Sequence, residues 1–500
     1  MTAASWPLVA LLVVPLLGAL ALLLLPRAAA DRHAVHLGTA VTAALVPLSV
    51  IAAPAPDVDV PWVTSLGLRL HLGIDGISGP LVVLTAALTF LCLAYCLPGV
   101  PAGRGPSAFV GLLLVLETGM LATFTALDLL LFFVAFEVVL LPMWALIAGW
   151  GGERRGPAAT TFVLYTLLGS ALMLLGILLV GLQAGTFDMT ELAARGGAGL
   201  APRVQLLAAL AMLVGFGIKA PVWPLHTWLP EAHTAAPTVG SVLLAGVLLK
   251  MGTYGIVRVA VPVVPEGMTR LAPYLAAFAV VSIVYGSLAC LAQRDLKRLI
   301  AYSSVGHMGF VLLGIASLTP VGITGALYAN IAHGVITGLL FFLAGAVKDR
   351  HGTADLDALG RGLYARAPRL GGLLAFGCVA SLGLPGLAGF WGEMLAMLGA
   401  FDAHPRLDRT VFLVLVGIAG LGTVLTAAYL LTLVRRVAQG TSDERWTRAD
   451  DGGHVVTDAS RTELLVWSPL VTAAVALGLW PGILLEVTTP AVTRLVEGAL

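Results

Sequence analysis

Long apolar runs recur along the whole chain, and short polar stretches separate them. A membrane-spanning helix needs about 20 mostly apolar residues. Open sheet edges cannot face lipid, and the sequence shows no alternating barrel pattern, so the runs are predicted to be helices. Fourteen runs meet this condition, approximately at residues 6–25, 34–53, 80–98, 108–127, 129–150, 157–183, 203–224, 237–261, 271–293, 298–317, 321–347, 369–400, 411–434 and 463–487.

The composition agrees with this pattern, because 59% hydrophobic and 11% charged residues lie outside the range of soluble proteins. The chain is therefore expected to be an all-α polytopic membrane protein. With the amino terminus outside, eighteen Lys and Arg residues fall in inner loops and eight on the outer side. This asymmetry favours fourteen spans with both ends outside. The first run lacks a preceding basic residue and a clear cleavage site, so it is expected to stay as a helix.

Two lysines, Lys219 and Lys250, lie inside apolar runs that contain no acidic residue. A charged side chain at membrane depth costs at least about 2.5 to 3.5 kcal/mol, so such residues usually face a partner or a wet cavity. Lysine can lose its proton when it is desolvated, whereas arginine effectively cannot. We therefore expect these two lysines to carry protons.

Two runs are broken near a titratable residue. The seventh breaks at Lys219-Ala-Pro-Val-Trp-Pro, and the twelfth breaks in SLGLPGLAGFWGEM, which contains Glu393. Irregular backbone at membrane depth is tolerated only where it lines protein or water. The breaks lie five helices apart, so the two copies cross the membrane in opposite directions. Spans 4–8 and 9–13 are therefore interpreted as two inverted five-helix repeats.

This interpretation divides the chain into four parts. They are three amino-terminal anchor helices (1–107), a first repeat (108–261), a second repeat (262–435), and an inner loop with a last helix (436–500).

Separate structures are predicted for three polar stretches between the spans. The outer loop 54–79 alternates apolar and polar residues and is expected to form a small hairpin over the membrane core. Residues 348–366 are predicted to form an amphipathic helix on the inner surface. The hydrophilic stretch 439–461 is expected to be a solvated inner loop, with partner docking as the alternative.

Further ionisable residues lie within the predicted spans. Span eight places Lys250, Tyr254 and Arg258 on one helical face. The alternative to proton transfer is a structural role for each residue. Glu137 and Lys219 would then form a static ion pair, Glu117 a local pair or cap, and each histidine a hydrogen bond to a carbonyl oxygen. The remaining candidates are Glu117 in span four, Glu137 in span five, His307 in span ten and His333 in span eleven.

Metal and redox sites find little support. The four cysteines lie in apolar runs and are expected to be buried hydrophobes. The pair His307 and His333 lacks a Cys or carboxylate at ligand spacing, and the spacing of His226, Glu231 and His233 fits no zinc motif. The sequence contains no nucleotide fingerprint and no cysteine cluster for iron–sulfur centres. Any energy for pumping must therefore come from a partner or an ion gradient, and the net charge of +1 does not indicate nucleic-acid binding.

The stretches GIKAPVWPLHTWLPEAHTAAPT and LLKMGTYGIVR closely resemble the antiporter-like subunits of respiratory complex I, and AYSSVGHMGF and SLGLPGLAGFWGEM extend the resemblance. It covers roughly spans three to thirteen. Within the family, Glu393 and Thr337 resemble the M type, because the L and N types usually have lysine at these places. The resemblance implies an ion pair of Glu137 with Lys219, a central relay at Lys250, a bridge of His307 and His333, and an outlet at Glu393.

The resemblance also implies the function, the partners and the location. The chain would be a proton-translocating subunit of an NADH–quinone oxidoreductase in a bacterial cell membrane, without a redox centre of its own. Its partners would be the L-, N-, K-, J-, A- and H-type subunits, with flavin, iron–sulfur clusters and the quinone site on other chains. We hypothesise that weakening of the Glu137–Lys219 pair sends a proton to Lys250, the histidines and Glu393. An Mrp-type sodium/proton antiporter subunit and a structural scaffold are the alternatives.

Overall fold

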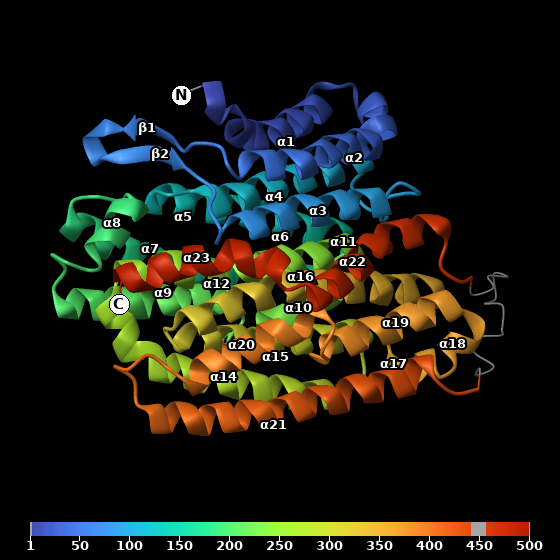
Figure 1. Cartoon of the computed structure of the whole chain (residues 1–500). Coiled ribbons are helices and arrows are strands. Elements are labelled where there is room, and N and C mark those ends of the chain that lie inside the picture. The colour runs from blue at the N-terminus through green and yellow to red at the C-terminus, as the bar shows by residue number, and fades with distance from the viewer. Residues whose placement is uncertain (1–2, 442–456, 500) are drawn as a thin grey trace.

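The computed structural model describes residues 3–441 and 457–499, and almost all of them are helical (Figure 1). The first half contains α1 (Trp6–Leu24), α2 (Arg27–Ala52), β1 (Val58–Val63), β2 (Leu68–Leu72), α3 (Gly79–Tyr95), α4 (Pro106–Thr125), α5 (Leu129–Val138), α6 (Leu140–Trp150), α7 (Arg155–Ala184), α8 (Met189–Arg195), α9 (Pro202–Lys219), α10 (Trp228–Ala235), α11 (Thr238–Leu243), η3 (Leu244–Leu248), α12 (Leu249–Gly255), η4 (Ile256–Ala260) and α13 (Val261–Val263). The second half contains α14 (Pro265–Leu291), α15 (Leu296–Ala316), α16 (Pro320–His351), α17 (Leu356–Leu359), α18 (Leu363–Arg366), α19 (Pro368–Ser381), α20 (Ala388–Phe401), α21 (Arg409–Leu433), η5 (Val434–Ala438), α22 (Arg461–Leu479) and α23 (Gly482–Ala499).

Within the described residues, twelve helices are long and apolar enough to cross a membrane. The shorter apolar helix α3 and the interrupted pair α19–α20 account for the two remaining predicted runs. The prediction of an all-helical, multi-pass membrane protein is thus confirmed. The physical reason is that a helix satisfies its own backbone hydrogen bonds, which lipid cannot do.

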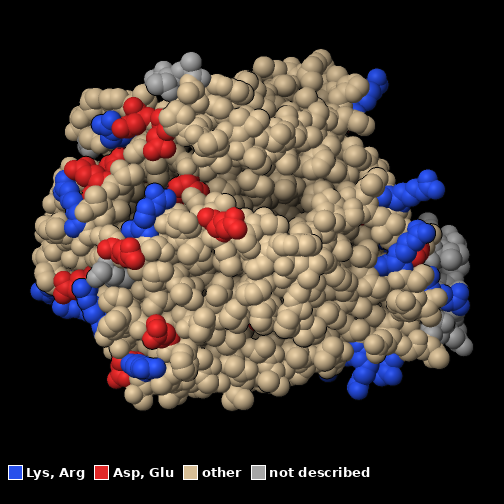
Figure 2. Space-filling view, viewed as in Figure 1, with Lys and Arg blue, Asp and Glu red and all other residues tan. Residues whose placement is uncertain are grey.

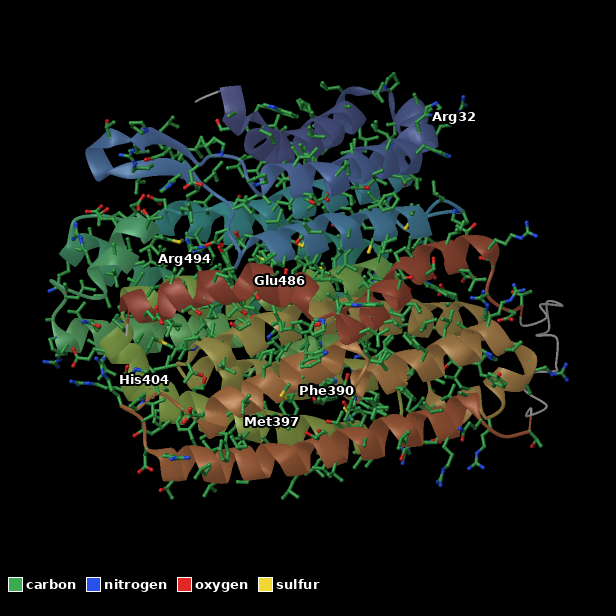
Figure 3. The ribbon with its side chains drawn as sticks, in the orientation of Figure 1. Arg32, Phe390, Met397, His404, Glu486 and Arg494 are labelled. Atoms are coloured by element: carbon green, nitrogen blue, oxygen red, sulfur yellow. The ribbon has the colours of Figure 1, made fainter. Side chains whose placement is uncertain are left out.

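The two ends of the molecule differ in charge. The long helices run in roughly one direction, and both chain termini lie at the same end (Figure 1). On the face shown in Figure 2, basic side chains prevail at one end, acidic and basic side chains mix at the other, and the belt between them is almost uncharged. The end that carries the turn between α1 and α2, with Arg32 (Figure 3), is called the inner end below.

Helix boundaries follow local chemistry. Proline stands at the start of α4, α9, α14, α16 and α19, where its missing N–H would have had no helical partner. Aspartate side chains cap α5, α8, α15 and α17 by accepting backbone N–H bonds; these residues are Asp128, Asp188, Asp295 and Asp355. The caps fix where these helices begin.

The same aspartates form two matching backbone bridges. Asp128 pairs with Asp188, and Asp295 pairs with Asp355, with the same separation along the chain. We propose that these bridges mark equivalent points of two repeats, 108–261 and 262–435. The proposal is supported by the two interrupted helices, one in each segment.

Both predicted breaks are present. Helix α9 ends at Lys219, and helical structure resumes at Trp228 with the short buried helix α10. Helix α19 ends at Ser381, and α20 begins at Ala388. Each break therefore places helix ends inside the molecule, next to Lys219 in one case and Glu393 in the other.

Two sequence predictions are wrong in detail. The run 463–487 is not one helix, because α22 ends before Trp480-Pro481 and α23 begins at Gly482. Residues 348–366 do not form a single amphipathic helix either. Glycines with positive φ at 352, 360 and 362 end α16 and separate it from the short helices α17 and α18.

The outer hairpin is confirmed. Strands β1 and β2 pair antiparallel, with Val58 opposite Leu72, and these two residues pack on Leu8 of α1. The predicted inner loop 439–461 lies mostly outside the described residues.

Burial separates central helices from peripheral ones. All residues in the most apolar 18-residue stretch of α16 are buried, and 94% of those in the corresponding stretch of residues 238–263 are buried. The corresponding values for α21 and α22 are only 22% and 28%. The helices that carry Lys250 and His333 are therefore shielded from lipid by the rest of the chain.

Candidate functional site

Lys250 lies in an irregular part of its helix. The π-helical segments η3 and η4 flank α12, which carries the lysine. Such segments change the helical register and often occur at functional sites. The side chain of Lys250 is fully buried, and its ammonium group donates to the carbonyl oxygen of Ala245 in η3.

The second partner of Lys250 is a histidine on another helix. Its Nζ lies 2.6 Å from Nδ1 of His333 on α16. The two helices approach closely because glycines face each other: a Cβ on Gly334 would come within 2.9 Å of the Gly246 carbonyl oxygen. The lysine donates, so Nδ1 of His333 accepts and the proton of the neutral ring belongs on Nε2. Nε2 has no hydrogen-bond partner among the described residues.

His307 and Glu393 continue the polar chain. Nδ1 of His307 on α15 lies 2.8 Å from Oε1 of Glu393 on α20, and Nε2 lies 2.9 Å from Oγ of Ser381. The rings of His307 and His333 are 5.7 Å apart between centroids. A cavity of about 20 Å³ lies between the two histidines and Glu393, and Thr337 also lines it. That volume is enough for one water molecule.

Polar neighbours hold the surrounding helices in place. Thr253 donates to Oδ1 of Asn330 at 3.1 Å, which ties α12 to α16 beside the lysine–histidine contact. Towards the outer end, Arg258 contacts the hydroxyl of Tyr254 at 3.3 Å and Asp75 at 2.6 Å. Burial alone would raise the pKa of Asp75, but the Arg258 guanidinium and two backbone N–H groups hold it below its usual value.

The front half of the predicted relay is arranged differently from the expectation. Lys219 is buried, and its Nζ lies over the ring of Phe136, 4.8 Å from the centroid. Among the described residues, Glu137 and Lys219 form no direct ion pair, so the contact implied by the resemblance is corrected. Glu137 is half-buried and still acts on Lys219 electrostatically. The reason is rotational: Phe136, the preceding residue of α5, faces the lysine instead.

Glu117 also stands apart from the central chain. Its side chain is fully buried in α4, and neither carboxylate oxygen has a hydrogen-bond partner among the described residues. A buried carboxyl without partners is costly when charged. Among the described residues, no hydrogen bond or ion pair joins Glu117 or Lys219 to Lys250, His333, His307 or Glu393.

Two buried residues on the inner side were given no role from the sequence. His233 on α10 is fully buried, stacks on Phe341 at 4.4 Å between ring centroids, and has no hydrogen-bond partner among the described residues for either ring nitrogen. Lys297 is also buried, and its Nζ donates to the Ala236 carbonyl oxygen at 3.0 Å. The charges of both Lys297 and Lys250 act on His233. The available signal was the position of His233 just after the break of span seven.

A cavity with a partly polar lining leads to these residues from the inner end. It has a volume of about 400 Å³, and its polar lining includes Lys297, Lys348 and Asp349. Thr238 and Ala236, which follow α10, form part of the same wall. The cavity thus reaches Ala236, whose carbonyl oxygen accepts from Lys297 and which lies three residues after His233.

The side chains of the site can exchange protons. Lysine, histidine and glutamate side chains can each gain or lose a proton. Among the described residues, no group of three or more His, Cys, Asp or Glu could hold a metal ion. The four cysteines are buried and free of disulfide bonds.

Comparison with known proteins places this geometry in a family. Residues 126–421 match the family described as "NADH:quinone oxidoreductase/Mrp antiporter, TM". The chain is 41% identical over 447 residues to NAD(P)H-quinone oxidoreductase chain 4 1 of Synechococcus elongatus, covering 88% of this chain and 81% of the relative. It is 38% identical over 488 residues to NADH-quinone oxidoreductase subunit M of Rhodobacter capsulatus, covering 94% and 91%.

Solved structures agree. A chain of respiratory complex I from Thermus thermophilus superposes with a TM-score of 0.86 at 32% identity, covering 99% of this chain and all of that chain. A chain of the Mrp complex from Dietzia superposes with a TM-score of 0.83 at 23% identity and shares the fold. The chain therefore belongs to the NADH:quinone oxidoreductase/Mrp antiporter family of membrane subunits.

Proposed function

We propose that this chain is the M-type, proton-translocating membrane-arm subunit of an NADH–quinone oxidoreductase. The observation that carries this proposal is the buried series of polar side chains that runs from Lys250 through His333 and His307 to Glu393. Two direct contacts, of 2.6 and 2.8 Å, lie within it. Static burial explains these groups poorly, because apolar replacements for buried charge pairs are often neutral or stabilising.

A proton moves along this chain by exchange between neighbouring groups. Lys250 gives a proton to Nδ1 of His333, and the ring releases its other proton from Nε2. A water molecule in the small cavity can pass this proton to the His307–Glu393 pair. Glu393 lies on α20, the helix that follows the break in span twelve, and delivers the proton towards the outer end.

Glu137 and Lys219 form the control element of the proposal. Glu137 stabilises the protonated form of Lys219 through its charge. A charge change arriving on the half-buried face of α5 weakens this effect, and the proton of Lys219 becomes easier to lose. Gly252 on α12 packs against Phe216 of α9 and against Ala220, which follows α9, so the helix of Lys250 lies beside the end of α9 that carries Lys219.

The proposal places proton uptake at the inner cavity. Water in the cavity reaches Lys297, which is tied to the backbone at Ala236. The charges of Lys297 and Lys250 both act on His233, and neither of its ring nitrogens has a hydrogen-bond partner among the described residues. His233 is therefore the proposed intermediate between the inner cavity and Lys250.

Redox chemistry belongs to partner chains in this proposal. Flavin, iron–sulfur clusters and the quinone site lie on other subunits, and the membrane-arm neighbours are the L-, N-, K-, J-, A- and H-type chains. The assembly resides in a bacterial cell membrane. The relatives named subunit M and chain 4 support this placement.

One experiment separates this function from that of an Mrp-type antiporter. Inverted membrane vesicles that contain the assembled chain are given NADH and quinone, and internal acidification is followed with a pH-sensitive dye. We expect acidification that starts with NADH and needs no sodium. Acidification that needs only a sodium gradient, and is indifferent to NADH, contradicts the proposal in favour of the antiporter.

A further inference from the structure

A deep apolar groove lies between α1 and α4 in the inner half of the molecule, with α6 as its floor. Its volume is about 660 Å³. The two helices touch near their middle, where a Cβ on Gly18 would meet Leu114 at 3.1 Å. The walls consist mainly of Leu16, Leu20 and Leu23 from α1 and Ala108, Gly111 and Leu112 from α4.

Small residues of α4 create the space. A Cβ added to Gly111 would meet no atom within 4 Å, so the groove is open at this position. The aliphatic side chains of its walls suit a hydrocarbon chain, whose tail needs no polar partner.

The inner end of the groove is basic and polar. Arg104 and Ser107 line it, and Arg104 is exposed and has no ion pair among the described residues. The nearby acid Asp31 already accepts from the backbone N–H and the hydroxyl of Ser107. Arg104 therefore presents a free positive charge at the depth where lipid headgroups lie.

A second unpartnered donor, the indole of Trp150, lies between this groove and the inner cavity. Trp150 lines the groove and is 5% exposed, and its indole Nε1 has no hydrogen-bond partner within the described chain. A buried indole N–H normally finds an acceptor. Its ring packs edge-on against Phe109, which fixes it at the inner end of the groove.

We propose that this groove binds an anionic phospholipid of the inner leaflet. One acyl chain lies between α1 and α4, and the phosphate contacts Arg104 with Trp150 as a neighbouring donor. Lipid tails are as apolar as leucine, so the groove itself gains little from exchanging one tail for another. Selection for an anionic headgroup therefore depends on Arg104.

Photo-crosslinking of the full chain, purified with its bound subunits, tests the proposal. The chain is reconstituted in phosphatidylcholine vesicles that contain a photoactivatable phosphatidylglycerol or the matching phosphatidylcholine probe. We expect the phosphatidylglycerol probe to label α1 and α4 peptides more strongly. Arg104→Gln is expected to lower this labelling about fivefold, since one basic residue near an anionic membrane surface contributes on that scale. Arg104→Lys is expected to retain most of it.

The matched controls change the same residue types elsewhere. Arg32→Gln removes an exposed inner arginine outside the groove, and Gly417→Leu adds a side chain where a Cβ meets nothing within 4 Å on the exposed face of α21. Gly111→Leu is expected to abolish labelling by both probes, while both controls leave it unchanged. Equal labelling by the two probes, undiminished labelling of Arg104→Gln, or a partner-subunit peptide crosslinked in the groove would each overturn the proposal.

Discussion

The ammonium nitrogen of Lys250 lies 2.6 Å from Nδ1 of His333, although the two residues are 83 positions apart in the sequence. Both side chains are buried, and among the described residues neither forms a hydrogen bond or ion pair with a carboxylate. The contact joins a group that can release a proton to one that can accept it. It is the central step of the proposed path.

Replacing Lys250 by arginine tests whether this residue must lose its proton. Arginine keeps the charge but cannot deprotonate in a protein. We expect Lys250→Arg and Lys250→Met to lower NADH-driven proton translocation alike, by at least about tenfold, as for loss of a positioned proton donor. Vesicle acidification per NADH oxidised is the measurement, with Arg435→Lys on the exposed inner surface as control. Full translocation in Lys250→Arg would mean that only the charge matters.

Glu393 is predicted to act as a proton carrier rather than as a structural partner of His307. Glu393→Gln retains a hydrogen-bonding side chain but cannot carry the proton, so we expect normal assembly with reduced translocation. Glu393→Lys restores a titratable group and is expected to translocate better than Glu393→Gln. Assembly is followed on native gels and translocation in vesicles. If Glu393→Gln pumps as well as the parent chain, the outlet lies elsewhere.

His233 offers a test of the inner uptake path. Its ring lies 4.4 Å from Phe341 with an interplanar angle of 6°, so His233→Phe keeps the stacking and removes both ring nitrogens. We expect an assembled complex with slower proton uptake from the inner side. Phe341→Leu, which disturbs the stack but keeps the histidine, is the control. Unchanged uptake in His233→Phe, measured by stopped-flow pH dye, would exclude this residue from the path.

The contact between His307 and Glu393 depends on close packing of α20 against α16. A Cβ on Gly392 would lie 2.5 Å from Cα of Ala329, where the backbone cannot yield cheaply. Gly392→Ala is therefore expected to separate the helices at a cost of about 1–3 kcal/mol. Thermal denaturation and translocation should both decline. Gly420→Ala, on a part of α21 where nothing lies within 4 Å, is the control and should change neither.

The outer hairpin is predicted to loosen in acid. Asp188 lies 2.6 Å from Nδ1 of His71 on β2 and caps α8. Burial alone would raise the pKa of Asp188, but hydrogen bonds from Thr190, Glu191 and His71 hold it below the usual 3.8. A depressed folded-state pKa means that the stabilisation is complete above about pH 4 and is lost as the pH falls through the folded value.

Hydrogen exchange of residues 58–72 measures this effect. Protection should decrease in strong acid in the parent chain. Asp188→Asn should show weaker protection already at neutral pH, by about 1–3 kcal/mol for a bond to a charged group, and little further change in acid. Asp59→Asn, which removes only an exposed partner of Arg69, is the control. Identical acid profiles for the parent chain and Asp188→Asn would contradict the assignment.

Several elements of the fold could be predicted without coordinates, since a bilayer forces each run of apolar residues into a helix. The breaks after Lys219 and Ser381 followed from proline and glycine. The identity of the titratable side chains followed from their cost at membrane depth, which makes Lys250 conspicuous among its apolar neighbours.

Which of these side chains touch could not be predicted. The contacts depend on how each helix is rotated and on how closely glycines allow two backbones to approach, and both are set by the whole bundle. Thus Lys250 meets His333, while Phe136 rather than Glu137 faces Lys219. His233 resembled no motif, and only its place beside Lys297 and the inner cavity gives it a role.

The sequence by itself determined a multi-pass helical membrane protein with two interrupted helices and a small set of ionisable residues within apolar runs, because hydropathy and backbone chemistry act locally. The tertiary structure alone decided which of those residues touch and which cavities lie beside them. These properties arise from distances between helices that are remote in the sequence, and no local pattern encodes them.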